Sequence, residues 1–452
     1  MRSINPATEE VIAEYEAFDS ARVDQALDLS IKSYKSWKQT SFGERAALMH
    51  RAADILRERC EEWSQLMTAE MGKPIKSARS ETNKCAWVCD FYAENAERFL
   101  TPEVIATDAK LSMRRHDPLG PILAVMPWNF PLWQVFRFAA PYLMAGNTGL
   151  LKHAGNTQGS ALAIEKIFLE AGFPEGVFQT LVVESDAVAD IIHDDRVRGV
   201  TLTGSERAGR AVGKAAGEAL KPSVLELGGS DPCIILADAD IEAAAEAAAL
   251  SRLINNGQSC IAAKRFIVVE ESYDAFVDAF RARLEARVMG DPTSEETDIG
   301  PQAREDLRDG LHDQLERTLE AGARCVLGGE IPEQTGYYYP ATLLLEVKPG
   351  MAAFDEEVFG PIAPVIRARD EQEAVALANH SDLGLGASLW TRDMDRALSI
   401  VPRIESGHVA VNGIVKSDPR LPFGGIKNSG YGRELSREGI LEFVNTKTVW
   451  MG

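Results

Sequence analysis

The first part of the chain spaces its apolar residues as helices do. Apolar side chains recur every three or four positions over residues 24–37, 44–71 and 80–100. The second run ends at Gly72, with Pro74 just beyond it. Glycine after the last turn and proline soon afterwards are typical of a helix end. The pattern therefore predicts three long amphipathic helices.

From residue 119 onward, short apolar segments alternate with helical patterns. Strands are predicted at 122–126, 149–152, 178–183 and 199–203, followed by helices that begin near residues 133, 158, 187 and 205. A second series has strands at 233–236, 265–269, 363–366 and 409–412. Such alternation indicates parallel sheets with helices on both faces. We therefore expect two α/β lobes.

Length and composition agree with a soluble protein of more than one lobe. The chain has 452 residues, of which 45% are hydrophobic and 26% charged. A net charge of −20 argues against a nucleic-acid partner, and an anionic ligand would need a local cluster of donors. No apolar stretch is long enough to span a membrane, and no signal-peptide core is present. A cytoplasmic protein is therefore expected.

Five of the six cysteines are assigned no chemical role. Cys85 and Cys89 lie one turn apart in a predicted helix, but two thiols without further ligands indicate packing rather than a metal site. Cys60, Cys233 and Cys325 stand in segments that favour buried structural roles. Neither a disulfide framework nor a bound metal is expected.

Cys260 has different neighbours. It follows Asn255-Asn256-Gly257-Gln258-Ser259, between a helix and the strand predicted at 265–269. Small and polar neighbours leave room for a substrate and keep the thiol near solvent. A thiolate with a lowered pKa can attack a carbonyl carbon. Cys260 is therefore the candidate nucleophile.

Two other polar residues stand at the ends of predicted strands. Glu226 precedes two glycines, and burial there would raise its carboxyl pKa toward that of a general base, although capping or a salt bridge is the commoner role. Asn129 lies between Pro127 and Pro131, which fix a rigid bend. A side-chain amide held rigidly at this edge is suited to stabilise an oxyanion.

A phosphate site is indicated where a strand passes through Gly204-Ser205 into a helix, because the N–H groups of a first helical turn attract anions. Ser205 equally fits an ordinary helix cap. Neither the G-x-G-x-x-G fingerprint nor a P-loop is present. Lys152, at the end of its strand, is the natural cation for a cofactor ribose or phosphate.

Together these segments resemble the aldehyde dehydrogenase superfamily over essentially the whole chain. The matching segments are Pro127-Trp128-Asn129-Phe130-Pro131, Lys152-His153-Ala154, Thr203-Gly204-Ser205, Glu226-Leu227-Gly228-Gly229, Gly257-Gln258-Ser259-Cys260, Glu356-Glu357-Val358-Phe359-Gly360-Pro361 and Pro422-Phe423-Gly424-Gly425. Residues 256–266 and 416–420 are similar in detail to bacterial NAD(P)-dependent succinate-semialdehyde dehydrogenases.

The resemblance implies an α/β fold of two Rossmann-type parallel-sheet lobes plus a small β flap for oligomerisation. Residues 1–108 and 119–228 would form the cofactor-binding domain and 229–421 the catalytic domain. Residues 109–118 and 422–452 would form the flap and the C-terminal segment. A homodimer or homotetramer is expected.

The resemblance also implies roles for individual residues. Cys260 would attack the aldehyde, and the Asn129 amide with the Cys260 N–H would hold the oxyanion. Hydride would pass to the nicotinamide, and Glu226 would activate water against the thioester. Lys152 is included among the catalytic residues. The implied cofactor contacts are Trp128, Asn129, Lys152, His153, Ala154, Gly155, Gly204, Ser205, Leu227, Glu357 (on the nicotinamide ribose) and Phe359 (near the ring).

Two departures from the family pattern matter. Gly155 stands where many NAD-preferring members have a glutamate that binds the ribose 2′-hydroxyl. Its absence removes repulsion against a 2′-phosphate, so NADP is the expected cofactor, with NAD as an alternative. Ala262 stands where some relatives carry a cysteine that forms a disulfide with the nucleophile, so that redox switch is not expected here.

The expected substrate is a small aldehyde with a carboxylate. Arg137 matches a carboxylate-binding arginine of semialdehyde dehydrogenases, although it could equally be a salt-bridged helix residue. Ser417 could add a hydroxyl, and Trp133 and Phe423 apolar walls. Ile254 replaces a second arginine of some relatives, which weakens the case for a strongly anionic substrate.

Succinate semialdehyde is thus the leading expectation. Glutarate semialdehyde or a broad range of aliphatic aldehydes is the alternative within the same enzyme class. An acylating dehydrogenase is less expected, because Glu226 supplies a base for water. A non-catalytic binding protein on the same fold is the alternative from another class.

Overall fold

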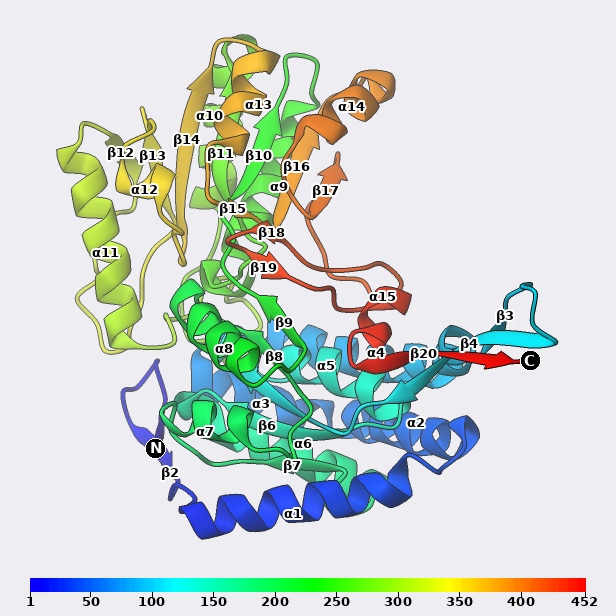
Figure 1. The fold of residues 1–452 in the computed structure, drawn as a ribbon. Helices are drawn as coiled ribbons and strands as arrows, with labels where there is room; N and C mark the ends of the chain where they lie inside the picture. The colour runs from blue at the N-terminus through cyan, green and yellow to red at the C-terminus, as the bar shows by residue number, and fades with distance from the viewer.

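The first hundred residues of the chain are mostly helical. The structure is a computed structural model that describes residues 1–452 (Figure 1). Helices α1 (Ser20–Trp37), α2 (Phe42–Glu58), α3 (Cys60–Met71) and α4 (Ile75–Leu100) confirm the predicted helical texture. The single helix expected over 44–71 is wrong, because the chain leaves helical geometry at Arg59 (φ −112°, ψ 27°). Apolar spacing continues on both sides of this residue, so the pattern does not reveal the break.

The first lobe is built on a six-stranded sheet in the order β19-β9-β8-β5-β6-β7. Its parallel strands are β5 (Pro121–Met126), β6 (Thr148–His153), β7 (Phe178–Thr180), β8 (Gly199–Thr203) and β9 (Ser223–Glu226). The intervening helices are α5 (Trp133–Met144), α6 (Gln158–Ala171), α7 (Ala187–His193) and α8 (Glu206–Glu218). The short strand β19 (Gly430–Tyr431) comes from the C-terminal segment and pairs antiparallel with β9.

The second lobe contains a seven-stranded sheet in the order β12-β13-β14-β11-β10-β16-β17. Its strands are β10 (Asp231–Ile235), β11 (Ala263–Val269), β12 (Arg324–Leu327), β13 (Thr342–Leu345), β14 (Ile362–Ala368), β16 (Gly386–Trp390) and β17 (His408–Val411). Only β12 is antiparallel to its neighbour. Helices α9 (Ile241–Leu253), α10 (Tyr273–Glu285), α11 (Glu305–Glu320), α12 (Ala352–Asp355), α13 (Glu371–Asn379) and α14 (Met394–Ile400) accompany it. The expected pair of mostly parallel lobes is confirmed.

A three-stranded antiparallel arm projects from the two lobes (Figure 1). Strand β4 (Leu111–Pro118) pairs with β20 (Val444–Met451) along its whole length and with β3 (Glu103–Val104) on its other side. One edge of β20 therefore has no strand beside it within the chain. Within 422–452 only β20 joins the arm, whereas β18 (Ile426–Lys427) pairs with β15 (Leu383–Gly384).

The remaining elements are short. They are β1 (Arg2–Ile4) and β2 (Val11–Glu14), helix α15 (Ser436–Leu441), and the 3₁₀ turns η1 (Gly155–Thr157), η2 (Ile254–Gly257), η3 (Glu270–Ser272) and η4 (Val401–Arg403). No helix has the length and apolar character needed to cross a membrane.

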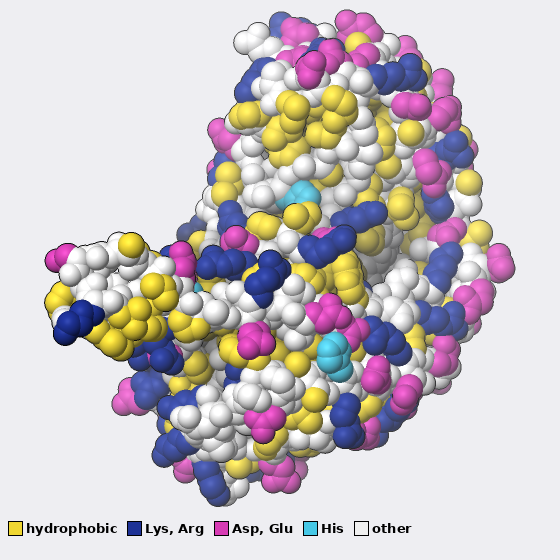
Figure 2. All heavy atoms as spheres, turned by 90° about the vertical axis from the view of Figure 1, so that its right-hand side faces the viewer, with side chains coloured by type: hydrophobic (Ala, Val, Ile, Leu, Met, Phe, Trp, Pro, Cys, Tyr) yellow, Lys and Arg dark blue, Asp and Glu magenta, His cyan; other side chains and the backbone are white.

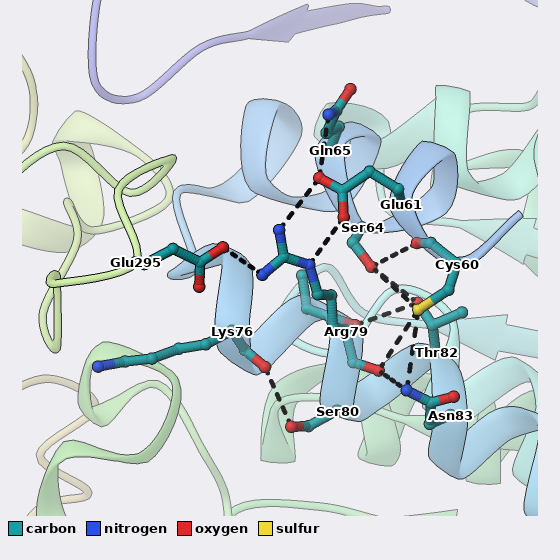
Figure 3. A network of polar contacts seen from close by, with 11 residues as sticks. Cys60, Glu61, Ser64, Gln65, Lys76, Arg79, Ser80, Thr82, Asn83 and Glu295 are labelled. Atoms are coloured by element: carbon teal, nitrogen blue, oxygen red, sulfur yellow. Dashed lines mark hydrogen bonds and ion pairs between the residues drawn. The ribbon is translucent and has the colours of Figure 1, made fainter. Parts of the chain in front are cut away.

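A polar network joins the N-terminal helices to a loop of the second lobe (Figure 3). The Arg79 guanidinium lies 2.7 Å from Glu61 and 2.5 Å from Glu295. Cys60 belongs to the same network: its Sγ lies 3.8 Å from Ser64 Oγ and 3.9 Å from the Arg79 carbonyl oxygen. The expectation of a buried structural Cys60 is wrong, since it is half-buried among polar atoms. Cys325 is likewise half-buried, whereas Cys233, Cys85 and Cys89 are buried.

Candidate active site

Four of the predicted site residues lie at one edge of the first sheet. Asn129 follows β5, Lys152 stands near the end of β6, Gly204 follows β8, and Glu226 ends β9. These strands are parallel neighbours, so their carboxyl ends share one edge. Ligands of open α/β sheets bind at this edge. Residues that lie far apart in the sequence are thus brought close together in the fold.

The loop before Cys260 has a strained backbone that its surroundings hold in place. Asn255, Asn256 and Gly257 have φ values of 54°, 59° and 78°, in the left-handed region. The Asn256 side chain donates to the carbonyls of Gly72 (3.0 Å) and Pro301 (2.9 Å). Such strain persists only where neighbouring contacts determine the conformation. The turn fixes the direction in which Cys260 is presented.

The Cys260 thiol is half-buried and opens onto a cavity of about 470 Å³. Burial raises the pKa of this thiol to about 12, while the positive charges of Lys264 and Arg137 act in the opposite direction. The Lys264 ammonium donates to the carbonyl oxygens of Cys260 (2.7 Å) and Ser259 (2.8 Å). The thiol is therefore protonated at neutral pH in this state and must lose a proton before it attacks.

Asn129 is held beside the nucleophile loop. Its Nδ2 donates to the Gln258 carbonyl (3.0 Å), and its Oδ1 accepts from Gln134 (3.1 Å). The second N–H of this amide and the backbone N–H of Cys260 donate to no protein acceptor. Two fixed donors near a nucleophile are what an oxyanion requires. The structure thus brings together the two groups that the sequence proposed as a pair.

Glu226 is fully buried, and neither of its carboxyl oxygens has a hydrogen-bond partner in the protein. Burial raises its pKa well above the usual value, and the charge of Glu434 adds to the effect, against Arg137 and Arg433. The commoner role of a capped or salt-bridged glutamate does not apply. A buried, unpartnered carboxyl group is costly in stability, so its presence favours a chemical role.

The phosphate end of the predicted cofactor site has the expected donors. Ser205 is the N-cap of α8, and its hydroxyl accepts from Ala208 N (3.3 Å). The other N–H groups of this first helical turn stay available for an anion. The Lys152 ammonium is largely buried and lies 3.4 Å from Ser185 Oγ, with no ion-pair partner. This donor set fits a dinucleotide phosphate.

Glu357 and Phe359 lie across the site on a loop of the second lobe. Glu357 accepts a hydrogen bond from Gly229 N (3.0 Å) and lies 3.3 Å from the Lys264 ammonium. The rings of Phe359 and Trp128 meet edge to face at 5.9 Å. At this place a carboxylate can accept hydrogen bonds from ribose hydroxyls, and an aromatic pair can pack against a planar ring.

His153, which the resemblance places among the cofactor contacts, is engaged inside the fold. Its Nε2 lies 2.9 Å from the Pro131 carbonyl oxygen, and its Nδ1 accepts from Ala154 N (2.8 Å). Burial lowers the pKa of the imidazole to about 4, so it is neutral. Both ring nitrogens are occupied, whereas Ala154 and Gly155 remain half-exposed beside it. Leu227 is buried against Gly209.

The cavity beside Cys260 contains all four residues expected to contact the substrate, namely Arg137, Ser417, Trp133 and Phe423, and also Ile254. Arg137 is not a free cation: its guanidinium lies 2.5 Å from Glu434, and both side chains are buried. The geometry therefore agrees with the salt-bridged alternative for Arg137. Whether it also contacts substrate stays a prediction.

The sequence interpretation missed Lys84 in this cavity wall and Glu434 behind it, as the partner of Arg137. Glu434 carries no local signal, because only the fold brings it to Arg137. Lys84 does carry a weak one: Ser77, Ser80 and Lys84 follow each other at spacings of three and four on α4, and all line the cavity. A polar stripe on an otherwise packed helix indicates a wetted or ligand-binding face.

A cysteine that opens onto a cavity, beside donors that fit a dinucleotide, is the arrangement expected of a cofactor-dependent enzyme acting on a carbonyl group. The chain belongs to the aldehyde dehydrogenase family: the model described as "Aldehyde dehydrogenase family" matches residues 1–449. Its activity is NAD(P)-dependent aldehyde oxidation. The family and the enzyme class expected from the sequence are confirmed.

Several proteins similar to this chain are succinate-semialdehyde dehydrogenases. A probable NADP-dependent succinate-semialdehyde dehydrogenase of Synechocystis sp. is 51% identical over 449 residues, covering 99% of each chain. An NAD(P)-dependent succinate semialdehyde dehydrogenase of Escherichia coli is 48% identical, over 99% of this chain and 97% of the relative. The crystal structure of succinic semialdehyde dehydrogenase from Streptococcus pyogenes with NADP+ superimposes with a TM-score of 0.98 at 36% identity, over 100% of this chain and 99% of the other.

Proposed function

We propose that this enzyme oxidises succinate semialdehyde to succinate, with NADP as the preferred cofactor and NAD as an alternative. The observation that carries the proposal is the cavity beside Cys260, which combines the cationic side chains Lys84 and Arg137 with the apolar walls Trp133 and Phe423. A short chain with an aldehyde at one end and a carboxylate at the other matches this arrangement. The relatives named above support the same substrate.

The residues at the site divide the reaction into two steps. The Cys260 sulfur, after losing its proton, attacks the aldehyde carbon, and the Asn129 amide with the Cys260 N–H stabilises the resulting oxyanion. A nicotinamide bound beside Glu357 and Phe359 would supply the acceptor for the hydride that leaves as the oxyanion collapses to a thioester. Glu226 then takes a proton from the water that cleaves the thioester and frees the thiol.

The cofactor preference follows from what surrounds Lys152. Its ammonium lies 3.4 Å from Ser185 Oγ and has no ion-pair partner, and Gly155, three residues further along the chain, brings no negative charge. A ribose 2′-phosphate would meet a cation here, without the repulsion that a carboxylate at position 155 would add. Lys152, the first turn of α8 and Glu357 would hold the phosphates and the nicotinamide ribose.

The enzyme is further proposed to be a homodimer or homotetramer assembled through the arm. Val104, Trp450 and Met451 on its strands and Ile105 just after β3 are exposed, and hydrophobic side chains cover much of the projecting arm in Figure 2. An open strand edge with apolar neighbours is a typical interface between copies of a chain. Light scattering should give a mass of two or four times 49.4 kDa. A monomer at micromolar concentration would contradict this assembly.

The substrate is tested by initial rates with NADP and NAD on succinate semialdehyde, glutarate semialdehyde and butanal. We expect kcat/KM to be highest for succinate semialdehyde with NADP. Glutarate semialdehyde is the second candidate, because a cavity discriminates one methylene by only about ten- to two-hundredfold. Equal kcat/KM on butanal would contradict the proposal in favour of a broad-range enzyme.

A further inference from the structure

Three cations line the substrate cavity, and their surroundings differ. The Lys76 ammonium is paired with Asp298 at 2.6 Å. The Arg137 guanidinium is paired with the Glu434 carboxylate at 2.5 Å, and the exposed fractions of the two side chains are 3% and 1%. It also donates to Thr203 Oγ1 (3.3 Å) and lies 4.8 Å from the Phe423 ring centre. Its positive charge is therefore already compensated inside the protein, and its position is fixed.

Lys84 lies in the same cavity without an anionic partner. Its ammonium donates to Ser417 Oγ at 2.7 Å and lies 4.2 Å from the Trp133 ring centre. No carboxylate lies within ion-pair distance. A partly buried ammonium that has only a hydroxyl and an aromatic face as neighbours lacks the compensation such charges normally have.

The two acids nearest to Lys84 are engaged elsewhere. Glu81 forms a buried ion pair with Lys73, and its Oε1 accepts from the N–H groups of Leu132 and Trp133, both at 2.9 Å. Asp418 accepts two hydrogen bonds from Arg420, at 2.9 and 2.7 Å. Neither carboxylate is free to turn toward Lys84. The missing anion must therefore come from outside the chain.

We propose that Lys84, together with the Ser417 hydroxyl, binds the distal carboxylate of the semialdehyde and sets the preference for carboxylated aldehydes, while Arg137 serves as the fixed partner of Glu434. The inference rests on the proposed function and names the residue that carries its specificity. Because Lys84 donates to Ser417 Oγ, the hydroxyl hydrogen of Ser417 is free to donate in turn. The two groups offer convergent donors, and charge-assisted hydrogen bonds of this kind are the strong ones.

Lys84 shares its cavity with the candidate nucleophile. Lys84, Ser417, Trp133 and Cys260 all line it. A carboxylate bound by Lys84 would direct the chain of the substrate along the cavity wall toward the thiol. An uncharged aldehyde can occupy the same space but gains no ionic contact.

The test compares Lys84→Met with the matched control Lys166→Met. Lys166 lies on α6, does not line the cavity, and has its ammonium 3.8 Å from Glu170. With Lys84→Met we expect KM for succinate semialdehyde to rise about ten- to hundredfold, as for loss of a charged hydrogen bond, while kcat and KM for butanal stay within about twofold. Lys166→Met should leave both substrates unchanged. Lys84→Arg, which keeps the charge, should recover part of the loss.

Three results would overturn the inference. The first is an unchanged ratio of the KM values for succinate semialdehyde and butanal in Lys84→Met. The second is an equal shift of that ratio in Lys166→Met, which would indicate an effect of net charge rather than of a local contact. The third is an equal rise in KM for butanal in Lys84→Met, which would show that Lys84 affects all aldehydes rather than carboxylated ones. Activity on butanal also shows that the variant is folded.

Failure of the proposed function would look different. The wild-type enzyme would then show no preference for succinate semialdehyde over butanal, whatever Lys84→Met does. A wild-type preference that survives in Lys84→Met removes only the role of Lys84. A Ser417→Ala variant adds a graded check, with an expected increase of a few-fold in the same KM.

Discussion

The guanidinium of Arg137 lies 2.5 Å from the carboxylate of Glu434, with both side chains almost wholly buried. Burial raises the pKa of Glu434, and the charge of Arg137 opposes that shift. Two buried charges are tolerated because each compensates the other. The pair joins α5 to the C-terminal segment near Glu226, so it contributes to the shape of the active site as well as to stability.

Loss of one member of this pair should be costly. We expect Glu434→Gln to lower the free energy of unfolding by about 3–5 kcal/mol, because the Arg137 charge is left buried without its partner. The measurement is a denaturant or thermal unfolding curve. The double variant Arg137→Met/Glu434→Leu should recover most of the loss, since an apolar pair of similar volume needs no compensation. Additive losses in the double variant would contradict a direct coupling.

The raised thiol pKa predicts slow alkylation of the cofactor-free enzyme. Burial raises the pKa of Cys260 to about 12, so its thiolate fraction, and with it the iodoacetamide rate, should rise about tenfold per pH unit between pH 7 and 9. The rate is measured by mass spectrometry on the peptide that contains Cys260. Cys260→Ala identifies the background from the half-exposed Cys60 and Cys325. A rate that is already constant by pH 8 would contradict a protonated resting thiol.

Much of the site could be predicted from the sequence because its residues stand in short segments with their own backbone requirements. Strand β8 has the bounds that the pattern predicted, 199–203, and the helix after it begins at the expected Ser205 cap. Cys260, Glu226 and Asn129 each stand at a turn or strand end whose neighbours restrict its geometry. Local patterns thus fixed where these groups are presented.

What could not be predicted depends on contacts between distant parts of the chain. Lys84 meets Ser417 across 333 positions, and no periodicity encodes that distance. The partner of Arg137 could not be predicted for the same reason. Glu434 lies near Arg137 because of the tertiary fold, in which residue 434 forms an antiparallel bridge with Phe423. Charge on a helix is normally solvated, so only the fold reveals that Lys84 faces a cavity.

The unpartnered carboxyl group of Glu226 makes a kinetic prediction. Glu226→Gln should form the thioester but hydrolyse it slowly, giving one burst of reduced cofactor per site followed by a low steady rate. Stopped-flow absorbance at the nicotinamide band measures both phases. Unimpaired steady turnover would remove Glu226 from the mechanism.

The same raised pKa gives this step a pH dependence in the wild-type enzyme. A carboxyl group whose pKa lies well above its usual value stays protonated, and inactive as a base, until the pH approaches that pKa. Steady turnover should therefore increase as the pH rises through the raised pKa of this carboxyl group. The height of the burst in Glu226→Gln should not follow this increase.

The titration of Lys84 predicts that KM depends on pH differently for carboxylated and uncharged aldehydes. Burial lowers the pKa of its ammonium to about 8, and the Arg137 charge adds to this, against Cys85, Glu81 and Asp418. Lys84 is thus charged below about pH 8 and neutral above it. The ratio of KM for succinate semialdehyde to KM for butanal should rise above that pH by about tenfold per unit.

The comparison of substrates isolates this titration, because the titrations of Cys260 and Glu226 affect both aldehydes alike. Lys84→Arg should flatten the ratio, since a guanidinium keeps its charge throughout this range. A ratio that does not change with pH in the wild-type enzyme would contradict the assignment of the charge to Lys84.

Gly257 should tolerate no side chain, because two constraints act on it at once. Its φ of 78° is unfavourable for other residues, and an added Cβ would lie 2.3 Å from the carbonyl carbon of Gly360. We expect Gly257→Ala to displace the loop that presents Cys260 and to lower kcat/KM by at least about a hundredfold, as misplaced reacting groups do. Gly217→Ala in α8 is the matched control, since a Cβ there meets nothing within 4 Å and alanine favours the helix by about 1 kcal/mol. If Gly257→Ala retains wild-type kcat/KM, the rigid turn before the nucleophile is not required for catalysis.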